Sequence, residues 1–374
     1  MHRSRWPGWC RRCRGLAASG VAIGCYVRIG RVSTAEPGSE SPRPRRSPKA
    51  GAGAGAGRSP RLRRFLRRAG ITIAGVIAAV TAASFGYNLA TDGPAPRPSG
   101  LRLIKGGGFD TRYRGWGTTG SPIVLIPGAF ETADAFSYLG PVLGATHRVY
   151  AIDLTGTGYS APSPPYDVTH LADQVLAFIR AMHLTGPNAP ILVGHSSGAA
   201  VAGMAALADP GSVSGVVFVD GDALPLAFPP LLGWLLINPY RTSLVRLGVG
   251  SDAVIKRVYQ SQCGPTCAPL SAAGVRAWRL PLQQPAFLDV IAFNLRHGIP
   301  AMTYAQLRAL KAESVPKLVI YGRDDPQLSP AGAAATAVRI GAPPPVAVPG
   351  RHLPIISSTR QVTAAIEEFI RRQQ

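Results

Sequence analysis

The strand-to-helix turn in residues 191–200, Ile-Leu-Val-Gly-His-Ser-Ser-Gly-Ala-Ala, constrains the fold more than any other feature of the chain. An apolar strand pattern runs into a helix of small residues through a G-x-S-x-G turn centred on Ser196. So tight a turn strains the backbone of its central residue, and side chains two positions away would collide, so Gly194 and Gly198 carry none. The following helix aims its N-terminal N–H groups at Ser196, where they stabilise negative charge. The segment therefore predicts an exposed nucleophilic serine at the end of a buried strand.

Short apolar runs alternate with helical patterns from residue 101 onward, which is typical of strands buried on both faces and separated by helices. The expected strands are Leu101–Lys105, Arg112–Trp116, Ile123–Ile126, Arg148–Ile152, Ile191–Val193, Gly215–Val219 and Lys317–Tyr321. The expected helices are Val168–Met182, Ser197–Leu207, Pro330–Ile340 and Arg360–Arg372. This rhythm predicts an α/β fold with a mostly parallel, doubly wound sheet over residues 101–374.

Residues from about 223 to 314 interrupt the alternation, because they are more helical and rich in Leu, Trp and Pro. We expect a helical cap inserted after a strand and lying over the strand ends. The cap contains one apolar cluster, made of Leu231, Leu232, Trp234, Leu235 and Leu236. This cluster is either the core of the cap or a lid that faces an acyl substrate or a bilayer.

An uncharged run of 23 residues, 69–91, follows five arginines in residues 61–68. A helix rises 1.5 Å per residue, so such a run can cross a hydrocarbon core of about 30 Å. The arginines should remain cytoplasmic, which places the domain beyond the Gly- and Pro-rich linker of residues 92–100 outside the cytoplasm. We therefore expect a signal anchor in the bilayer. A cleaved signal peptide, which would release a secreted domain, and a buried helix of a soluble domain are the alternatives.

The formal net charge of +21 comes mostly from residues 1–68, which hold 17 of the 40 Lys and Arg residues and two acidic residues. This segment is rich in Arg, Gly, Pro, Ser and Ala, so we expect a disordered basic tail. The rest of the chain is only mildly basic. Because the charge belongs to a tail rather than to a folded surface, we expect no nucleic-acid partner.

The five cysteines fall into two groups, and neither predicts a metal site. Cys10 and Cys13 form a single C-x-x-C with His2 as the one other candidate ligand nearby, whereas zinc needs four ligands. Cys263 and Cys267 lie far downstream. In an oxidising compartment they are able to pair, and two free thiols are the alternative.

Residues from about 101 to 370 resemble enzymes of the α/β-hydrolase fold, in the branch with a helical cap. Five segments, one of which is the turn at Ser196, match features of that family in the order found there. The matching segments are Ile126–Phe130, the D-x-x-G-x-G-x-S run Asp153–Ser160, Gly194–Gly198, Gly322–Pro326 and Gly350–Pro354. The resemblance implies the catalytic order Ser, Asp, His.

The resemblance also implies a role for each matching residue. Ser196 attacks a substrate carbonyl, His352 takes the proton of the serine and returns it to the leaving group, and Asp325 orients the imidazole. Three other carboxylates remain alternatives for the acid: Asp324, Asp220 and Asp222.

The backbone N–H groups of Ala129 and Ser197 are the expected oxyanion donors, and His195 is expected to be structural. The chain departs from the family at two positions: Pro127 replaces a histidine and Arg351 replaces a glycine. Neither change removes a catalytic atom. Arg351 places a cation near the expected catalytic histidine, where it would lower the pKa of that histidine or bind an anionic substrate group.

The expected function is that of an exported serine hydrolase, esterase- or lipase-like, acting on a small and apolar acyl substrate without metal or organic cofactor. The same three residues also support amide hydrolysis, carbon–carbon bond hydrolysis or cofactor-free peroxidation. A non-catalytic receptor is disfavoured, because such relatives usually lose the serine or the histidine and this chain keeps both. The sequence sets neither the substrate nor the oligomeric state.

Overall fold

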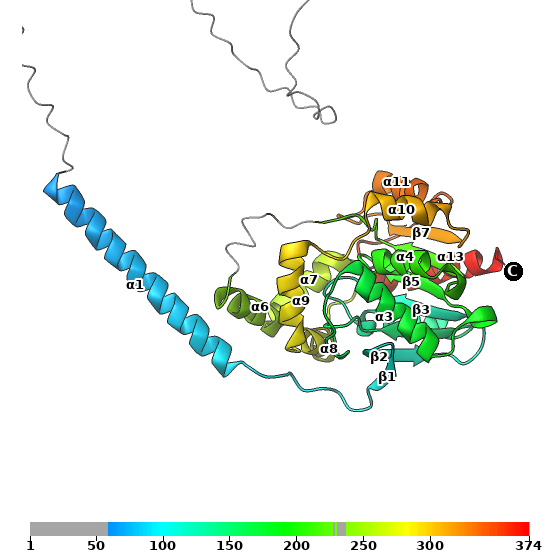
Figure 1. The fold of residues 1–374 in the computed structure, drawn as a ribbon, viewed down its shortest axis with the longest axis horizontal. Helices are drawn as coiled ribbons and strands as arrows, with labels where there is room; N and C mark the ends of the chain where they lie inside the picture. The colour runs from blue at the N-terminus through cyan, green and yellow to red at the C-terminus, as the bar shows by residue number, and fades with distance from the viewer. Residues whose placement is uncertain (1–58, 227–228, 230–236, 374) are drawn as a thin grey trace, which may run out of the picture. The chain divides into compact units, whose positions relative to one another are not determined.

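The computed structural model describes residues 59–226, 229 and 237–373 (Figure 1). The basic tail up to residue 58, with its cysteines, and the apolar cluster of residues 231–236 lie outside the described residues.

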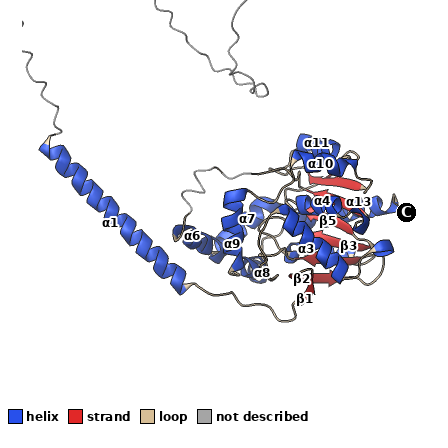
Figure 2. Ribbon diagram, in the orientation of Figure 1, coloured by secondary structure: helices blue, strands red, loops and turns tan. Residues whose placement is uncertain are grey.

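In the described residues a single eight-stranded sheet forms the centre of the domain (Figure 2). Its strand order is β1-β2-β4-β3-β5-β6-β7-β8. β1 pairs antiparallel with β2 and β2 with β4, and all other pairs are parallel. The strands are β1 (Arg102–Gly106), β2 (Phe109–Trp116), β3 (Pro122–Ile126), β4 (Arg148–Ile152), β5 (Ile191–His195), β6 (Gly215–Val219), β7 (Lys317–Gly322) and β8 (Val346–Val348). The expected α/β class with a mostly parallel sheet is confirmed, while β8 was not anticipated.

Helices cover both faces of the sheet, because alternate residues of the central strands point to opposite sides. Val124 and Ile126 belong to one buried cluster, and Ile123 and Leu125 belong to the other. The first cluster is completed by α3 (Val168–Ala181), α4 (Gly198–Ala208), α10 (Tyr304–Ala312) and α11 (Pro330–Ile340). The second is completed mainly by α2 (Leu139–Leu143), α12 (Pro354–Ser357) and α13 (Thr359–Arg371).

Between β6 and β7 the chain forms the expected helical insertion. Its helices are α6 (Tyr240–Gly250), α7 (Asp252–Cys263), α8 (Ala272–Leu282) and α9 (Ala286–His297), followed by α10, which packs against α4 and α11. Cys263 and Cys267 form a disulfide at the end of α7, and both are buried.

Helix α1 (Pro60–Ala90) contains the expected membrane span except for Thr91. Its large apolar side chains, among them Ile71, Val76 and Phe85, are exposed. Within the described part of the chain, α1 is the one helix long and apolar enough to cross a membrane.

Candidate active site

The imidazole of His352 lies within hydrogen-bond distance of both Ser196 and Asp325 at the carboxyl edge of the sheet. The Nε2 atom of His352 is 3.0 Å from the Oγ of Ser196, and its Nδ1 is 2.9 Å from the Oδ2 of Asp325. The three residues come from the turn after β5, the loop after β8 and the loop after β7. A hydroxyl, an imidazole and a carboxylate aligned in this way can activate the hydroxyl as a nucleophile.

The turn at Ser196 has the backbone strain expected from the sequence. Ser196 adopts a positive φ of 51°, which is sparsely populated by residues with a side chain. A Cβ atom on Gly194 would fall on the backbone of Gly198, and one on Gly198 would lie 2.6 Å from the carbonyl oxygen of Pro127. Both glycines are therefore required for the close approach of the backbone that exposes the serine hydroxyl.

Asp325 is the carboxylate that meets the histidine. Its side chain is fully buried, and its Oδ1 accepts the N–H of Gln327 at 2.8 Å. Burial alone would raise the pKa of Asp325, but the hydrogen bond and charge of His352 outweigh it and hold the pKa below its usual value. Asp325 is therefore ionised at neutral pH and suited to orient an imidazole.

None of the three alternative carboxylates makes a hydrogen bond to His352 among the described residues. Asp324 is exposed, and Asp222 accepts the backbone N–H of Leu224. Asp220 is buried beside Asp325, where burial and the charge of Asp325 raise its pKa well above the usual value. These effects disfavour the charged form of Asp220, and it makes no hydrogen bond to His352 among the described residues.

The expected oxyanion donors lie beside the serine, but one of them is occupied. The N–H of Ala129 donates to the Oγ of Ser197 at 2.8 Å. The N–H of Ser197, at the N-terminus of α4, has no hydrogen-bond acceptor among the described residues. A substrate oxygen that binds both N–H groups has to displace the Ser197 hydroxyl, which a rotation about χ1 of Ser197 allows.

A buried ion pair behind the turn was missed by the sequence analysis. The Nδ1 of His195 is 2.7 Å from the Oε2 of Glu131, and its Nε2 is 2.6 Å from the carbonyl oxygen of His352. Glu131 also accepts the N–H of Gly128 at 3.0 Å. No local sequence pattern predicts this pair, because its members are separated by 64 residues.

The charges of the pair follow from its partners. Burial alone would lower the pKa of His195, but the charge and hydrogen bond of Glu131 and the carbonyl of His352 raise it. Burial alone would raise the pKa of Glu131, but His195 and the N–H of Gly128 lower it. These contacts favour the charged forms of both groups, and each ring nitrogen of His195 faces an acceptor.

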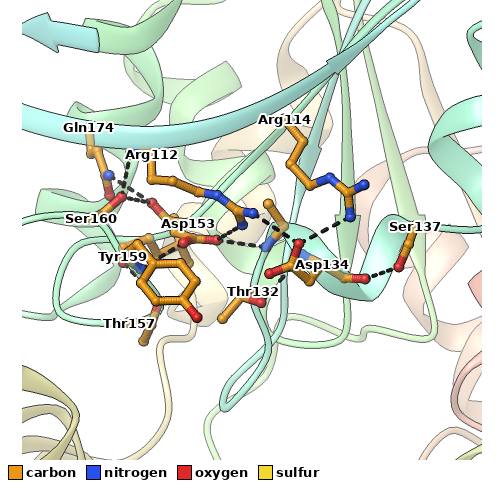
Figure 3. Close-up of polar contacts among 12 residues, drawn as sticks. Arg112, Arg114, Thr132, Asp134, Ser137, Asp153, Thr157, Tyr159, Ser160 and Gln174 are labelled. Atoms are coloured by element: carbon orange, nitrogen blue, oxygen red, sulfur yellow. Dashed lines mark hydrogen bonds and ion pairs between the residues drawn. The ribbon is translucent and has the colours of Figure 1, made fainter. Parts of the chain in front are cut away.

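The D-x-x-G-x-G-x-S segment has a positioning role (Figure 3). The Oδ1 of Asp153 accepts the N–H of Ala133 at 2.8 Å and lies 3.1 Å from the Nη1 of Arg112. Its Oδ2 accepts the N–H of Tyr159, and the hydroxyl of Ser160 donates to its backbone oxygen. Asp153 thus ties the loop after β3, which carries Ala129, to β2 and to its own turn.

Two cavities meet at Ser196 and His352. One has a volume of about 300 Å³ and is lined by Asp222, Leu224, Leu226, Pro300 and Leu328, among others. The other has about 240 Å³ and is mainly apolar, with Phe130, Ile255, Tyr259, Trp278 and Leu282 in its wall. Among the residues that the structure describes, no Lys or Arg side chain lines either cavity. Arg351 lies outside both, where its Nη1 donates to the carbonyl oxygen of Ser261.

Within the described ranges no group of three or more His, Cys, Asp or Glu side chains is arranged to hold a metal ion.

Comparison with known proteins places this geometry in context. A sequence model of the alpha/beta hydrolase family matches residues 123–366, more than half of the chain. N-formylmaleamate deformylase of Pseudomonas putida is 25% identical over 204 residues, which cover 53% of this chain and 73% of that protein. The pimeloyl-[acyl-carrier protein] methyl ester esterase of Edwardsiella ictaluri is 33% identical over 107 residues, covering 28% of this chain and 39% of the esterase.

Solved structures share the fold. A thermophilic esterase from Thermogutta terrifontis superposes with a TM-score of 0.59 and 24% identity, covering 74% of this chain and 99% of the esterase chain. At this identity the likeness supports the arrangement of the strands and helices, and the chemistry rests on the residues at Ser196.

Proposed function

Because the chain belongs to the alpha/beta hydrolase family, we propose that this hydrolase cleaves a carboxylic ester with Ser196, His352 and Asp325, while α1 holds it to a membrane. The observation that carries the proposal is the hydrogen-bonded alignment of the serine hydroxyl, the imidazole and the buried carboxylate. Similarity to an esterase over part of the chain supports the choice of an ester.

The reaction proceeds in two halves. The Oγ of Ser196 attacks the ester carbonyl as the Nε2 of His352 takes its proton, and the tetrahedral oxyanion forms. His352 returns the proton to the leaving alcohol, and the acyl group stays on the serine. Water then attacks the acyl group as His352 takes its proton, and His352 returns that proton to the Oγ of Ser196 as the bond to the acyl group breaks and the acid leaves. Asp325 remains ionised throughout and stabilises the imidazolium.

The oxyanion receives hydrogen bonds from the N–H groups of Ala129 and Ser197. Each such donor contributes about 3–4 kcal/mol to lowering the barrier. The Ser197 hydroxyl, which accepts the N–H of Ala129, gives way to the substrate oxygen. Because the hydroxyl occupies the donor before substrate arrives, the donor is not left unpaired in a partly buried site.

The substrate is a small, neutral and largely apolar acyl compound. The two cavities at Ser196 provide space for one apolar group on each side of the scissile bond. A carboxylate on the substrate would meet Asp222, and the described walls of the two cavities offer it no Lys or Arg side chain. Amide cleavage by the same three residues is the second candidate, favoured by the similarity to N-formylmaleamate deformylase.

The membrane part of the proposal rests on α1 and its flanking arginines. The arginines of the first turns remain on the cytoplasmic side, and the hydrolase domain lies on the other side. Cleavage after the apolar segment is the alternative, and it would yield a secreted domain with the same active site.

Hydrolysis of p-nitrophenyl esters by the purified full-length chain in detergent tests the proposal. The Ser196→Ala variant should lose turnover by about 10⁵-fold or more, because it lacks the attacking atom. The control variant Ser261→Ala removes an exposed hydroxyl that bonds only within α7, and it should match the wild type. Retained turnover in Ser196→Ala would contradict the proposal, and so would an inactive wild type on esters and amides alike.

A further inference from the structure

A third cavity, with a volume of about 520 Å³, lies away from Ser196 between the start of the sheet and the cap. It is formed by the linker before β1, by β1 and β2, and by α8. Four of its wall residues are arginines from three of these elements: Arg102, Arg112, Arg114 and Arg276. No catalytic role accounts for this concentration of positive charge.

The acidic residues at this cavity are too few to neutralise the arginines. Asp134 is the one carboxylate that the described residues contribute to the wall, and it is shared by Arg112 at 2.9 Å and Arg114 at 3.1 Å. Asp153, behind the wall, pairs with Arg112 at 3.1 Å. The two carboxylates therefore balance two of the four guanidinium groups.

The remaining two arginines have no acidic partner. Arg102 and Arg276 make no ion pair or side-chain hydrogen bond among the described residues, and both are exposed. Each presents donors in a planar fork that matches the oxygens of a phosphate or carboxylate. Their two positive charges therefore lie at an open cavity and are not neutralised by acidic side chains of the described residues.

Arg112 and Arg114 provide the fixed part of the wall (Figure 3). Arg112 is 5% exposed and held by both carboxylates, and its buried Nε has no acceptor in the described part of the chain. Arg114 donates to Asp134 through Nη1 alone and stacks over Trp116 at 4.9 Å. Burial and the nearby Asp134 raise the pKa of Tyr159 to about 12, so its phenol in the wall stays neutral.

We propose that this cavity binds a phosphate group attached to an organic moiety. Arg102 and Arg276 pair with the phosphate, Arg114 adds its free donors, and the Trp116 and Leu280 side chains contact the organic part. The cavity is larger than an inorganic phosphate requires, which favours a phosphate ester. This second site is separate from the proposed ester-cleaving site and does not depend on its chemistry.

The phosphate ester has two possible sources, a lipid headgroup or a soluble compound. Pro98, Ser99 and Gly100 line the cavity, and only residues 91–97 separate them from α1. Fully extended, this linker reaches about 25–30 Å. If α1 lies in the bilayer as proposed, the cavity is held close enough to the membrane surface for anionic headgroups to compete for it.

Binding of glycerol 3-phosphate to the full-length chain tests the proposal. The protein is reconstituted in nanodiscs of phosphatidylcholine, and binding is followed by isothermal titration calorimetry. Saturable binding is expected, and the double variant Arg102→Gln/Arg276→Gln should weaken it by about tenfold or more. The control double variant Arg308→Gln/Arg360→Gln removes two exposed charges on α10 and α13 and should bind as the wild type does. Ester turnover should be unchanged in both variants, which shows that each is folded.

A second arm repeats the titration in nanodiscs that contain phosphatidylglycerol. Weaker binding of glycerol 3-phosphate there, in the wild type and the control variant alike, assigns the cavity to lipid headgroups. Equal binding in both discs assigns it to a soluble phosphate ester. Absence of saturable binding to the wild type in neutral discs, or equal weakening by the two double variants, would overturn the proposal.

Discussion

Two imidazole–carboxylate pairs lie side by side in this protein, with their ring centroids 5.1 Å apart. His352 meets Asp325 at 2.9 Å, and His195 meets Glu131 at 2.7 Å. The pairs differ in what the second ring nitrogen contacts. For His352 it is a hydroxyl, which either donates or accepts a hydrogen bond, and for His195 it is a carbonyl oxygen, which only accepts.

This difference assigns different tasks to the same two chemical groups. A carbonyl and a carboxylate together require protons on both nitrogens of His195, so that pair is a fixed ion pair. The hydroxyl lets His352 act as a base. The fixed pair also joins two loops, because Glu131 accepts the N–H of Gly128 and His195 donates to the backbone of His352. It is therefore placed to position the reacting groups without touching the substrate.

Removing the charge from the catalytic pair should have the largest effect. Asp325→Asn leaves the shape intact but no longer stabilises an imidazolium, so kcat/KM for a p-nitrophenyl ester should fall by about 10⁴-fold. Asp220→Asn provides the matched control. Its carboxyl accepts the N–H of Gly322 and its raised pKa disfavours the charged form, so kcat/KM should stay within about tenfold. A reversed ranking would identify Asp220 as the acid.

Breaking the fixed pair should chiefly reduce stability. Glu131→Gln leaves the imidazolium of His195 buried without its counter-charge and should lower the free energy of unfolding by about 3–5 kcal/mol. The double variant Glu131→Gln/His195→Gln removes both charges, so its free energy of unfolding should be higher than that of Glu131→Gln. Urea unfolding of the full-length variants in detergent measures both values. A double variant less stable than Glu131→Gln would contradict an ion pair.

The stability contribution of the fixed pair should depend on pH in a defined direction. The pKa of His195 is raised in the folded protein. Its contribution to the free energy of unfolding is therefore fully present below pH 6.5, the ordinary pKa, and is lost as the pH rises through the folded pKa. The pKa of Glu131 is lowered in the folded protein. Its contribution is therefore fully present above pH 4.5, the ordinary pKa, and is lost as the pH falls through the folded pKa. The destabilisation by Glu131→Gln should therefore be largest between about pH 4.5 and 6.5 and shrink at alkaline pH. A deficit that grows with alkaline pH would contradict this assignment.

Ser197→Ala should have the smallest effect, since its hydroxyl only occupies the N–H of Ala129 until substrate binds. We expect kcat/KM within about threefold of the wild type, or above it. Steady-state kinetics decide the matter. A loss of 100-fold or more would mean that the hydroxyl itself takes part in the reaction.

The same contrast separates what the sequence predicts from what it does not. The strand, the turn at Ser196 and the following helix were predictable, because apolar runs and paired glycines are local signals. Asp325 and His352 came from resemblance to a family in which their loops have recognisable sequences. Glu131 and His195 form a pair only after β3 and β5 lie adjacent in the sheet, so no local pattern identifies them. Strand β8 was missed because it has three residues, of which two are exposed.

The most direct test of the different roles of the two pairs is the labelling of Ser196 by a fluorophosphonate. The rate is measured as a second-order rate constant. The reaction needs a base at the serine but no substrate-specific contacts. We predict that His352→Gln slows labelling by about 10³-fold or more, whereas Glu131→Gln/His195→Gln slows it by no more than about tenfold. Equal losses in the two variants, or rapid labelling without His352, would contradict the account.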